Sequence, residues 1–121
     1  KGVHYLCHSG IEIDGVYFYG LPMFVADELN GDYEKAISRI PSDTDVLITH
    51  QPSYGILDFT EGVHYGNVSL LSRVLCIKPR LHLFGHVHKA NGKLEAHDTL
   101  YVNGSLVSGM KIAYTPQLIH L

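Results

Sequence analysis

Two short apolar segments, each followed by histidines, place the strongest constraint on the fold of this chain. Asp45–His50 (DVLITH) and Leu81–Phe84 (LHLF) have the length and composition of buried strands. Between them, Asn67–Lys78 has the apolar spacing of a helix, with an Asn at its start, and Pro79 lies just beyond its end. Because parallel neighbouring strands need such a crossover, this order predicts a layered α/β domain.

The remaining segments predict more strands and a second helix. Ile11–Gly20 is typical of a β-hairpin with a tight turn at Asp14-Gly15, and Asn30–Pro41 is typical of a helix that Asn30 or Asp32 could cap. Residues 99–105 and 110–121 predict two later strands. The apolar stripes expected on the helices are Tyr33, Ala36, Ile37 and Ile40 on the first, and Val68, Leu71, Val74 and Leu75 on the second.

Composition excludes several classes of protein. The 121 residues suffice for one globular domain, with 45% hydrophobic and 17% charged residues. The formal charge of −3 provides no basic footprint for nucleic acid or an anionic membrane. We find no apolar run long enough to span a bilayer and no leader peptide. Cys7 and Cys76 lack C-x-x-C spacing, so we expect reduced thiols and a cytoplasmic location.

Three histidines directly follow the two apolar strands. His50 follows the first, and His86 and His88 follow the second as an H-x-H pair preceded by Gly85. Neutral imidazoles suit Zn, Mn, Fe or Ni, and ligands collect at the carboxyl ends of parallel strands. An extended H-x-H segment would point both rings to one side. The alternative is that these are hydrogen-bonded or surface histidines, and the residues alone leave both interpretations open.

The residues around these histidines resemble those of a known enzyme family. DVLITHQPSYGILD, followed by a helix, KPRLHLFGHVHKANG and TLYVNGS, is similar to the second half of the calcineurin-like metallophosphoesterases of the small-domain subgroup. The resemblance extends from about Tyr5 to Ser105. It implies that residues 1–121 form the C-terminal half of one metallophosphoesterase domain. The fold would then be part of a four-layer α/β/β/α sandwich, incomplete in this chain.

By this resemblance, His50 and His86 would ligate one metal ion and His88 a second. The complete enzyme would bind two divalent ions (Mn, Fe, Zn or Ni), which clamp a phosphoryl group and activate a bridging water. The expected reaction is hydrolysis of a small phosphomonoester or phosphodiester, rather than action on nucleic acid or at a membrane.

The carboxylates that such a site needs are absent from this sequence. The family's D-x-H, GDxxD and GNH[DE] motifs have no counterpart, and Gly31-Asp32 is better explained as a helix start. Three neutral imidazoles cannot offset the four positive charges of two divalent ions, so this chain alone should hold at most one. We therefore expect no catalytic residue in this chain and little activity from it alone. It should depend on a missing N-terminal half, in cis or in trans, or self-associate.

Several other polar residues are weaker candidates. Gln51 replaces a glycine of the subgroup pattern and could contact substrate, as could Asn103 at a strand end; a solvated loop and a turn are the alternatives. Asp58 is expected to close its loop, with contact to a substrate or to a histidine of the metal site as the alternative. His64 is expected to lie on the surface or at a substrate entrance. His82 alternates away from its leucine neighbours and is expected to be a packed, hydrogen-bonded strand residue.

Two rival functions remain open. The chain could be a non-catalytic binding or regulatory domain that keeps the sheet and binds one structural ion. A pyrophosphohydrolase or nuclease version of the same chemistry is the weaker option.

Overall fold

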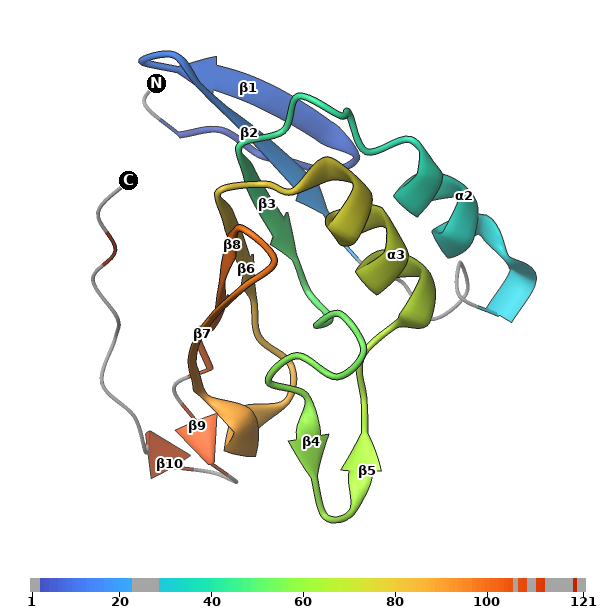
Figure 1. The fold of residues 1–121 in the computed structure, drawn as a ribbon, viewed down its shortest axis with the longest axis vertical. Helices are drawn as coiled ribbons and strands as arrows, with labels where there is room; N and C mark the ends of the chain where they lie inside the picture. The colour runs from blue at the N-terminus through green and yellow to red at the C-terminus, as the bar shows by residue number, and fades with distance from the viewer. Residues whose placement is uncertain (1–2, 23–28, 106, 109–110, 113–118, 120–121) are drawn as a thin grey trace.

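The computed structural model describes residues 3–22, 29–105, 107–108, 111–112 and 119, and its centre is a six-stranded sheet in the order β1-β2-β3-β6-β8-β7 (Figure 1). The inner strands β2, β3, β6 and β8 are parallel, and β1 and β7 pair antiparallel at the edges. The strands of this sheet are β1 (Ser9–Ile13), β2 (Val16–Leu21), β3 (Val46–Thr49), β6 (Leu81–Phe84), β7 (Gly92–Ala96) and β8 (Thr99–Asn103). The predicted parallel pairing of the two apolar segments is confirmed.

Two helices connect the parallel strands and lie on the same face of the sheet, as Figure 1 shows. Helix α2 (Asp32–Ser38) joins β2 to β3, and α3 (Val68–Ile77) joins β3 to β6. Each crossover moves one strand further in the same direction across the sheet. Because such connections are almost always right-handed, both helices must fall on one side. The mixed α/β class is thereby confirmed, whereas a four-layer sandwich stays a prediction.

The helices bury one face of the sheet in the main core. The predicted stripe of α2 is confirmed, since Tyr33, Ala36, Ile37 and Ile40 are all buried. The predicted stripe of α3 is partly wrong: Leu70 and Val74 are buried, while Val68 and Leu75 are exposed. Helix α3 therefore faces α2 and the sheet through an i, i+4 pair rotated from the expected stripe. Asn67 caps it as predicted, its Oδ1 accepting from the Leu70 N–H at 2.8 Å.

The opposite face of the sheet is also apolar, but no helix among the described residues covers it. Val46, Leu81 and Val102 are buried there by their neighbours, while Ile48 is 37% exposed. The partly buried side chains packed against this cluster are Val16, Phe18, Leu83, Leu100 and Ile119. The sheet thus presents apolar side chains on both faces, which is typical of a sheet that lies between two layers.

Turns, four short strands and a short 3-10 helix complete the described residues. The predicted hairpin turn is confirmed, with Asp14 and Gly15 both at positive φ. A small hairpin of β4 (Phe59–Thr60) and β5 (Val63–His64) was not expected; it projects below the sheet in Figure 1. The remaining elements are the 3-10 helix η1 (His88–Ala90) and the two-residue strands β9 (Val107–Ser108) and β10 (Lys111–Ile112).

Most of the predicted last strand, residues 110–121, lies outside the described part of the chain. Among the residues that are described, no helix has the length and hydrophobicity needed to cross a lipid bilayer.

Candidate functional site

The histidine-bearing loops meet at the carboxyl edge of the parallel strands. His50 immediately follows β3, and His86 follows β6 after one glycine. The two strands are hydrogen-bonded neighbours with Ile48 opposite Leu83. Beyond the strand ends, the Gly85 N–H donates to the carbonyl oxygen of His50 at 3.2 Å, so the sheet ladder effectively continues to the histidines. The sequence prediction that these strand ends lie together is confirmed.

His50 and His86 contact each other through their ring nitrogens. The Nε2 atom of His50 lies 3.0 Å from Nδ1 of His86, and the ring centroids are 4.7 Å apart. Two nitrogens bound to one Zn²⁺ at about 2.0–2.1 Å would be about 2.9 Å apart at octahedral angles and about 3.3 Å at tetrahedral angles. The observed separation is that of a hydrogen bond between the two rings, and it also lies in the range for two adjacent ligands of a single ion.

The backbone at His86 is strained in a way that places its ring. His86 has φ +68°, and the Val87 N–H donates to the Gly85 carbonyl oxygen at 2.7 Å. This is a three-residue γ-turn with a positive φ at its centre, a rare conformation. The expectation of an extended H-x-H segment is therefore wrong, because the chain turns sharply at its first histidine, His86. Strain of this kind is concentrated at functional sites.

His88 begins η1 and lines a cavity of about 260 Å³ together with His86. The other wall of this cavity comes from the β4–β5 hairpin and Tyr65 after it. Within the described residues, no three His, Cys, Asp or Glu side chains come close enough together to hold a metal ion. The structure thus brings together two of the three predicted ligands, and it places His88 on the same cavity without joining it to the pair.

The far wall of the cavity contains polar residues that the sequence did not single out. Thr60, Glu61 and Tyr65 face it from the hairpin side, and Lys89 lies beside His88. The Lys89 ammonium is 3.9 Å from a Glu61 carboxylate oxygen, with both side chains well exposed. The sequence signal that could have indicated this hairpin is the Glu61-Gly62 pair, which supplies the two positive-φ positions of its turn.

The two predicted substrate contacts, Gln51 and Asn103, are both buried in the structure. The Gln51 amide donates to the Tyr65 carbonyl oxygen at 3.0 Å. The Asn103 amide donates to the carbonyl oxygens of Val87 at 2.9 Å and Leu57 at 3.1 Å. These contacts tie the histidine loops to the loops around them. A substrate contact by either side chain stays a prediction.

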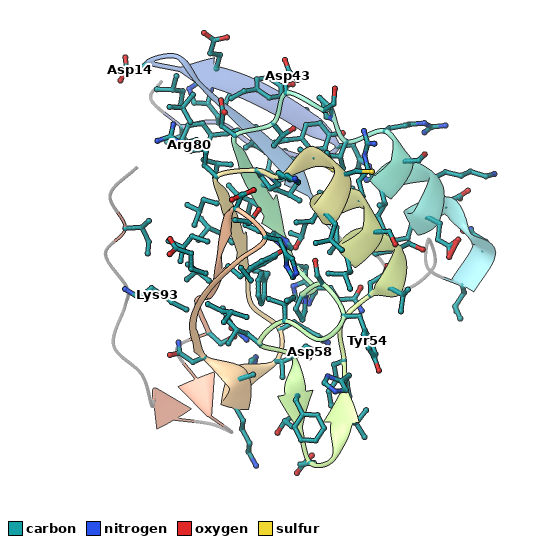
Figure 2. All side chains as sticks on the ribbon, in the orientation of Figure 1. Asp14, Asp43, Tyr54, Asp58, Arg80 and Lys93 are labelled. Carbon is teal, nitrogen blue, oxygen red and sulfur yellow. The ribbon has the colours of Figure 1, made fainter. Side chains whose placement is uncertain are left out.

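Asp58 is the buried centre of the loop before the hairpin. One of its carboxylate oxygens accepts from the N–H groups of Gly55 and Gly66, each at 2.9 Å, and the other lies 2.8 Å from Nδ1 of His64. The His64 ring is flanked by the rings of Tyr54 and Phe59 (Figure 2 labels Asp58 and Tyr54). The expected loop closure by Asp58 is thereby confirmed, while contact with a substrate or with a histidine of the metal site stays a prediction.

His82 is fully buried beneath the site. Its Nε2 lies 2.9 Å from the Thr49 hydroxyl, which confirms the prediction of a packed, hydrogen-bonded strand residue. Burial lowers the pKa of His82 to about 3, so its ring is neutral at neutral pH.

Comparisons with known proteins relate this geometry to a family. No family model matches the chain. The chain is 36% identical over 113 residues to UPF0046 protein K07C11.7 of Caenorhabditis elegans, covering 85% of this chain and 38% of that protein. It is 36% identical over 112 residues to Metallophosphoesterase domain-containing protein 1 of Homo sapiens, covering 84% of this chain and 34% of that protein.

A solved crystal structure supports the fold: its TM-score is 0.60 at 18% identity, over 83% of this chain and 45% of that one. The chain thus spans less than half of the length of these relatives. The similarities support a relationship between this chain and a metallophosphoesterase-related family.

Proposed function

We propose that this chain supplies the histidine side of a two-metal phosphoesterase site in a longer or two-chain protein. The observation that carries the proposal is the 3.0 Å approach of His50 Nε2 to His86 Nδ1 at the ends of adjacent parallel strands. His88 would serve a second ion across the same cavity. The proposed reaction of the complete protein is hydrolysis of a phosphomonoester or phosphodiester.

The chain itself would hold the metal ions and position them. His50 and His86 are held by the β3–β6 pairing and by the γ-turn at His86, so their ring nitrogens lie 3.0 Å apart. Bound divalent ions would supply Lewis acidity and a water of lowered pKa. Lys89 lies on the same cavity wall, where its ammonium could attract the phosphate oxygens of a substrate.

Charge supports the view that this half is inactive alone. No carboxylate joins His50 and His86 within the described residues. An ion held there keeps its charge uncompensated, and a second ion close by would be repelled. We therefore propose that this chain alone holds at most one ion, and that the missing carboxylates lie in an N-terminal half.

The apolar sheet face without a helix supports the same division. Ile48 and the partly buried Phe18, Leu83 and Leu100 form an apolar surface of the kind that a second sheet covers in a sandwich. We propose that the missing half covers this face, completing a four-layer domain. In its absence, a second copy of the chain would be the occupant.

Metal content tests the site. Purified chain should take up about one Mn²⁺ or Zn²⁺ per molecule, measured by mass spectrometry at equilibrium dialysis against the free ion. Two imidazoles form a half-site of modest affinity, so the free ion must be present. His86→Ala should abolish this uptake. His97→Asn is the matched control, since His97 is exposed in the turn between β7 and β8, at the other edge of the sheet. Equal metal content in His86→Ala and wild type would contradict the proposal.

Phosphoesterase activity tests whether catalysis requires both halves of the domain. The chain alone should not hydrolyse p-nitrophenyl phosphate or its diester with Mn²⁺, whereas a protein extended by an upstream half with the D-x-H, GDxxD and GNH[DE] motifs should. Metal uptake without activity in the extended protein would favour the rival function, a non-catalytic domain with one bound ion.

A further inference from the structure

We propose that His82, a buried residue outside the histidine pair, is a positioning residue that sets the orientation of His50 through Thr49. The inference rests on the proposed role of His50 as a metal ligand. His82 lies on β6 and points into the helix-covered face, where it is 0% exposed and contacts the rings of Phe84 and Tyr101.

The hydrogen-bond directions follow from the partners. The Thr49 hydroxyl lies 2.6 Å from the Gln51 carbonyl oxygen, which can only accept. The single hydroxyl hydrogen of Thr49 is therefore directed at Gln51. At 2.9 Å the His82 ring must then donate from Nε2 to the Thr49 oxygen. His82 thus carries its proton on Nε2, and its buried Nδ1 has no hydrogen-bond partner among the described residues.

This chain of hydrogen bonds encloses the backbone of His50. Thr49 and Gln51 are its two neighbours, and the Thr49 hydroxyl bridges across His50 to the Gln51 carbonyl. The Gly85 N–H holds the His50 carbonyl from the other side. Three consecutive residues are thus fixed at the point where the strand ends. The side chain of His50 leaves this fixed turn toward His86.

A rival role for His82 is simple core packing, with no influence on His50. The two roles differ in what a substitution should do. If His82 only fills space, an apolar residue of similar size should leave the histidine pair intact. If His82 orients the turn, a donor at the Nε2 position is needed, and its loss should loosen the pair even in a folded protein.

Two matched pairs of variants separate these roles. His82→Gln keeps a nitrogen donor where Nε2 lies, whereas His82→Leu removes it. Thr49→Ser keeps the bridging hydroxyl, whereas Thr49→Val removes it at nearly equal size. The Thr49 pair keeps the test decisive should His82→Leu fail to fold.

The first readout is NMR of the metal-free chain. Nitrogen-15 shifts of the wild type should show His82 protonated at Nε2 only. Cross-relaxation between the His50 and His86 rings should persist in His82→Gln and Thr49→Ser, and it should weaken or vanish in His82→Leu and Thr49→Val. A His82 protonated at Nδ1, or unchanged cross-relaxation in both folded donor-deletion variants, would overturn the proposal.

The second readout is Co²⁺ binding followed by absorption spectroscopy. Loss of the donor should weaken Co²⁺ binding by about 10- to 100-fold, whereas the donor-keeping variants should stay within about threefold of wild type. Wild-type chain that binds no Co²⁺ would contradict the proposed metal site, while the NMR result would still decide the role of His82. Equal Co²⁺ affinity in all four variants would overturn the positioning role.

Discussion

The buried His82 makes a quantitative prediction about stability and pH. Its pKa in the folded chain is about 3 against 6.5 for the ordinary group, with burial as the cause. Between these values the unfolded chain binds a proton that the folded chain excludes. The free energy of unfolding should therefore fall as the pH falls below 6.5, and this contribution should be fully recovered above it.

The magnitude follows from the width of that window. Each pH unit well below 6.5 is worth about 1.4 kcal/mol for one proton, so lowering the pH from about 7.5 to about 5 should remove about 2 kcal/mol through His82 alone. The side chain is fully buried, so solvent screening does not reduce this figure. For a domain of this size, 2 kcal/mol is a large part of the total stability.

Urea unfolding followed by circular dichroism at several pH values between about 5 and 7.5 measures the effect. His82→Gln keeps the donor to Thr49 but cannot titrate, so the difference in unfolding free energy between it and wild type should change by about 2 kcal/mol across the window. His97→Asn removes an exposed histidine and should leave the wild-type pH dependence nearly intact. Parallel curves for wild type and His82→Gln would refute the reasoning.

Two further substitutions test how the site is held together. Asn103→Leu removes the amide donor to the carbonyl oxygens of Leu57 and Val87, of which Val87 keeps the Ala90 N–H at 3.1 Å. It should lower the free energy of unfolding by about 1–3 kcal/mol in urea titrations. A loss below about 0.5 kcal/mol would show that water replaces the amide. Asp58→Asn can keep one oxygen for the two backbone N–H groups but replaces the oxygen that faces Nδ1 of His64 by an NH2 group. It should destabilise the chain by about 1–3 kcal/mol and release the His64 ring, visible as altered ring-proton shifts. Unchanged shifts would contradict the anchoring role of Asp58.

The central layer of the fold could be predicted from sequence because its signals are local and strong. The strand β3 contains three consecutive apolar residues, Val46–Ile48, and α3 has an Asn cap and a Pro stop. Such segments indicate their own structure, and the right-handed crossover rule then fixes their arrangement. The meeting of His50 and His86 followed from that arrangement.

Other elements were missed for physical reasons. Strands β4 and β5 have two residues each, too short for any alternation to be visible. The turn before β8 uses His97 and Asp98 at positive φ, without the glycine that normally indicates such a turn. Which side chains of α3 are buried depends on where α2 packs, and the tertiary structure determines that. The γ-turn at His86 has a positive φ at a residue that is not glycine, so no turn residue indicated it.

For the polar residues near the site, the sequence predicted their type of environment but not their hydrogen-bond partners. His82 was expected to be buried and bonded, but its partner Thr49 is 33 residues away and becomes its neighbour only through the β3–β6 pairing. Asn103 was noticed for its strand-end position. Its double hydrogen bond to Val87 and Leu57 depends on loop paths that no spacing rule specifies.

The most direct test of the metal half-site is anomalous X-ray diffraction from crystals of this chain grown with Zn²⁺. The account predicts one zinc peak bonded to Nε2 of His50 and Nδ1 of His86, each at about 2.0–2.1 Å. A zinc bound only at other histidines, with the His50 and His86 nitrogens still 3.0 Å apart and facing each other, would contradict it.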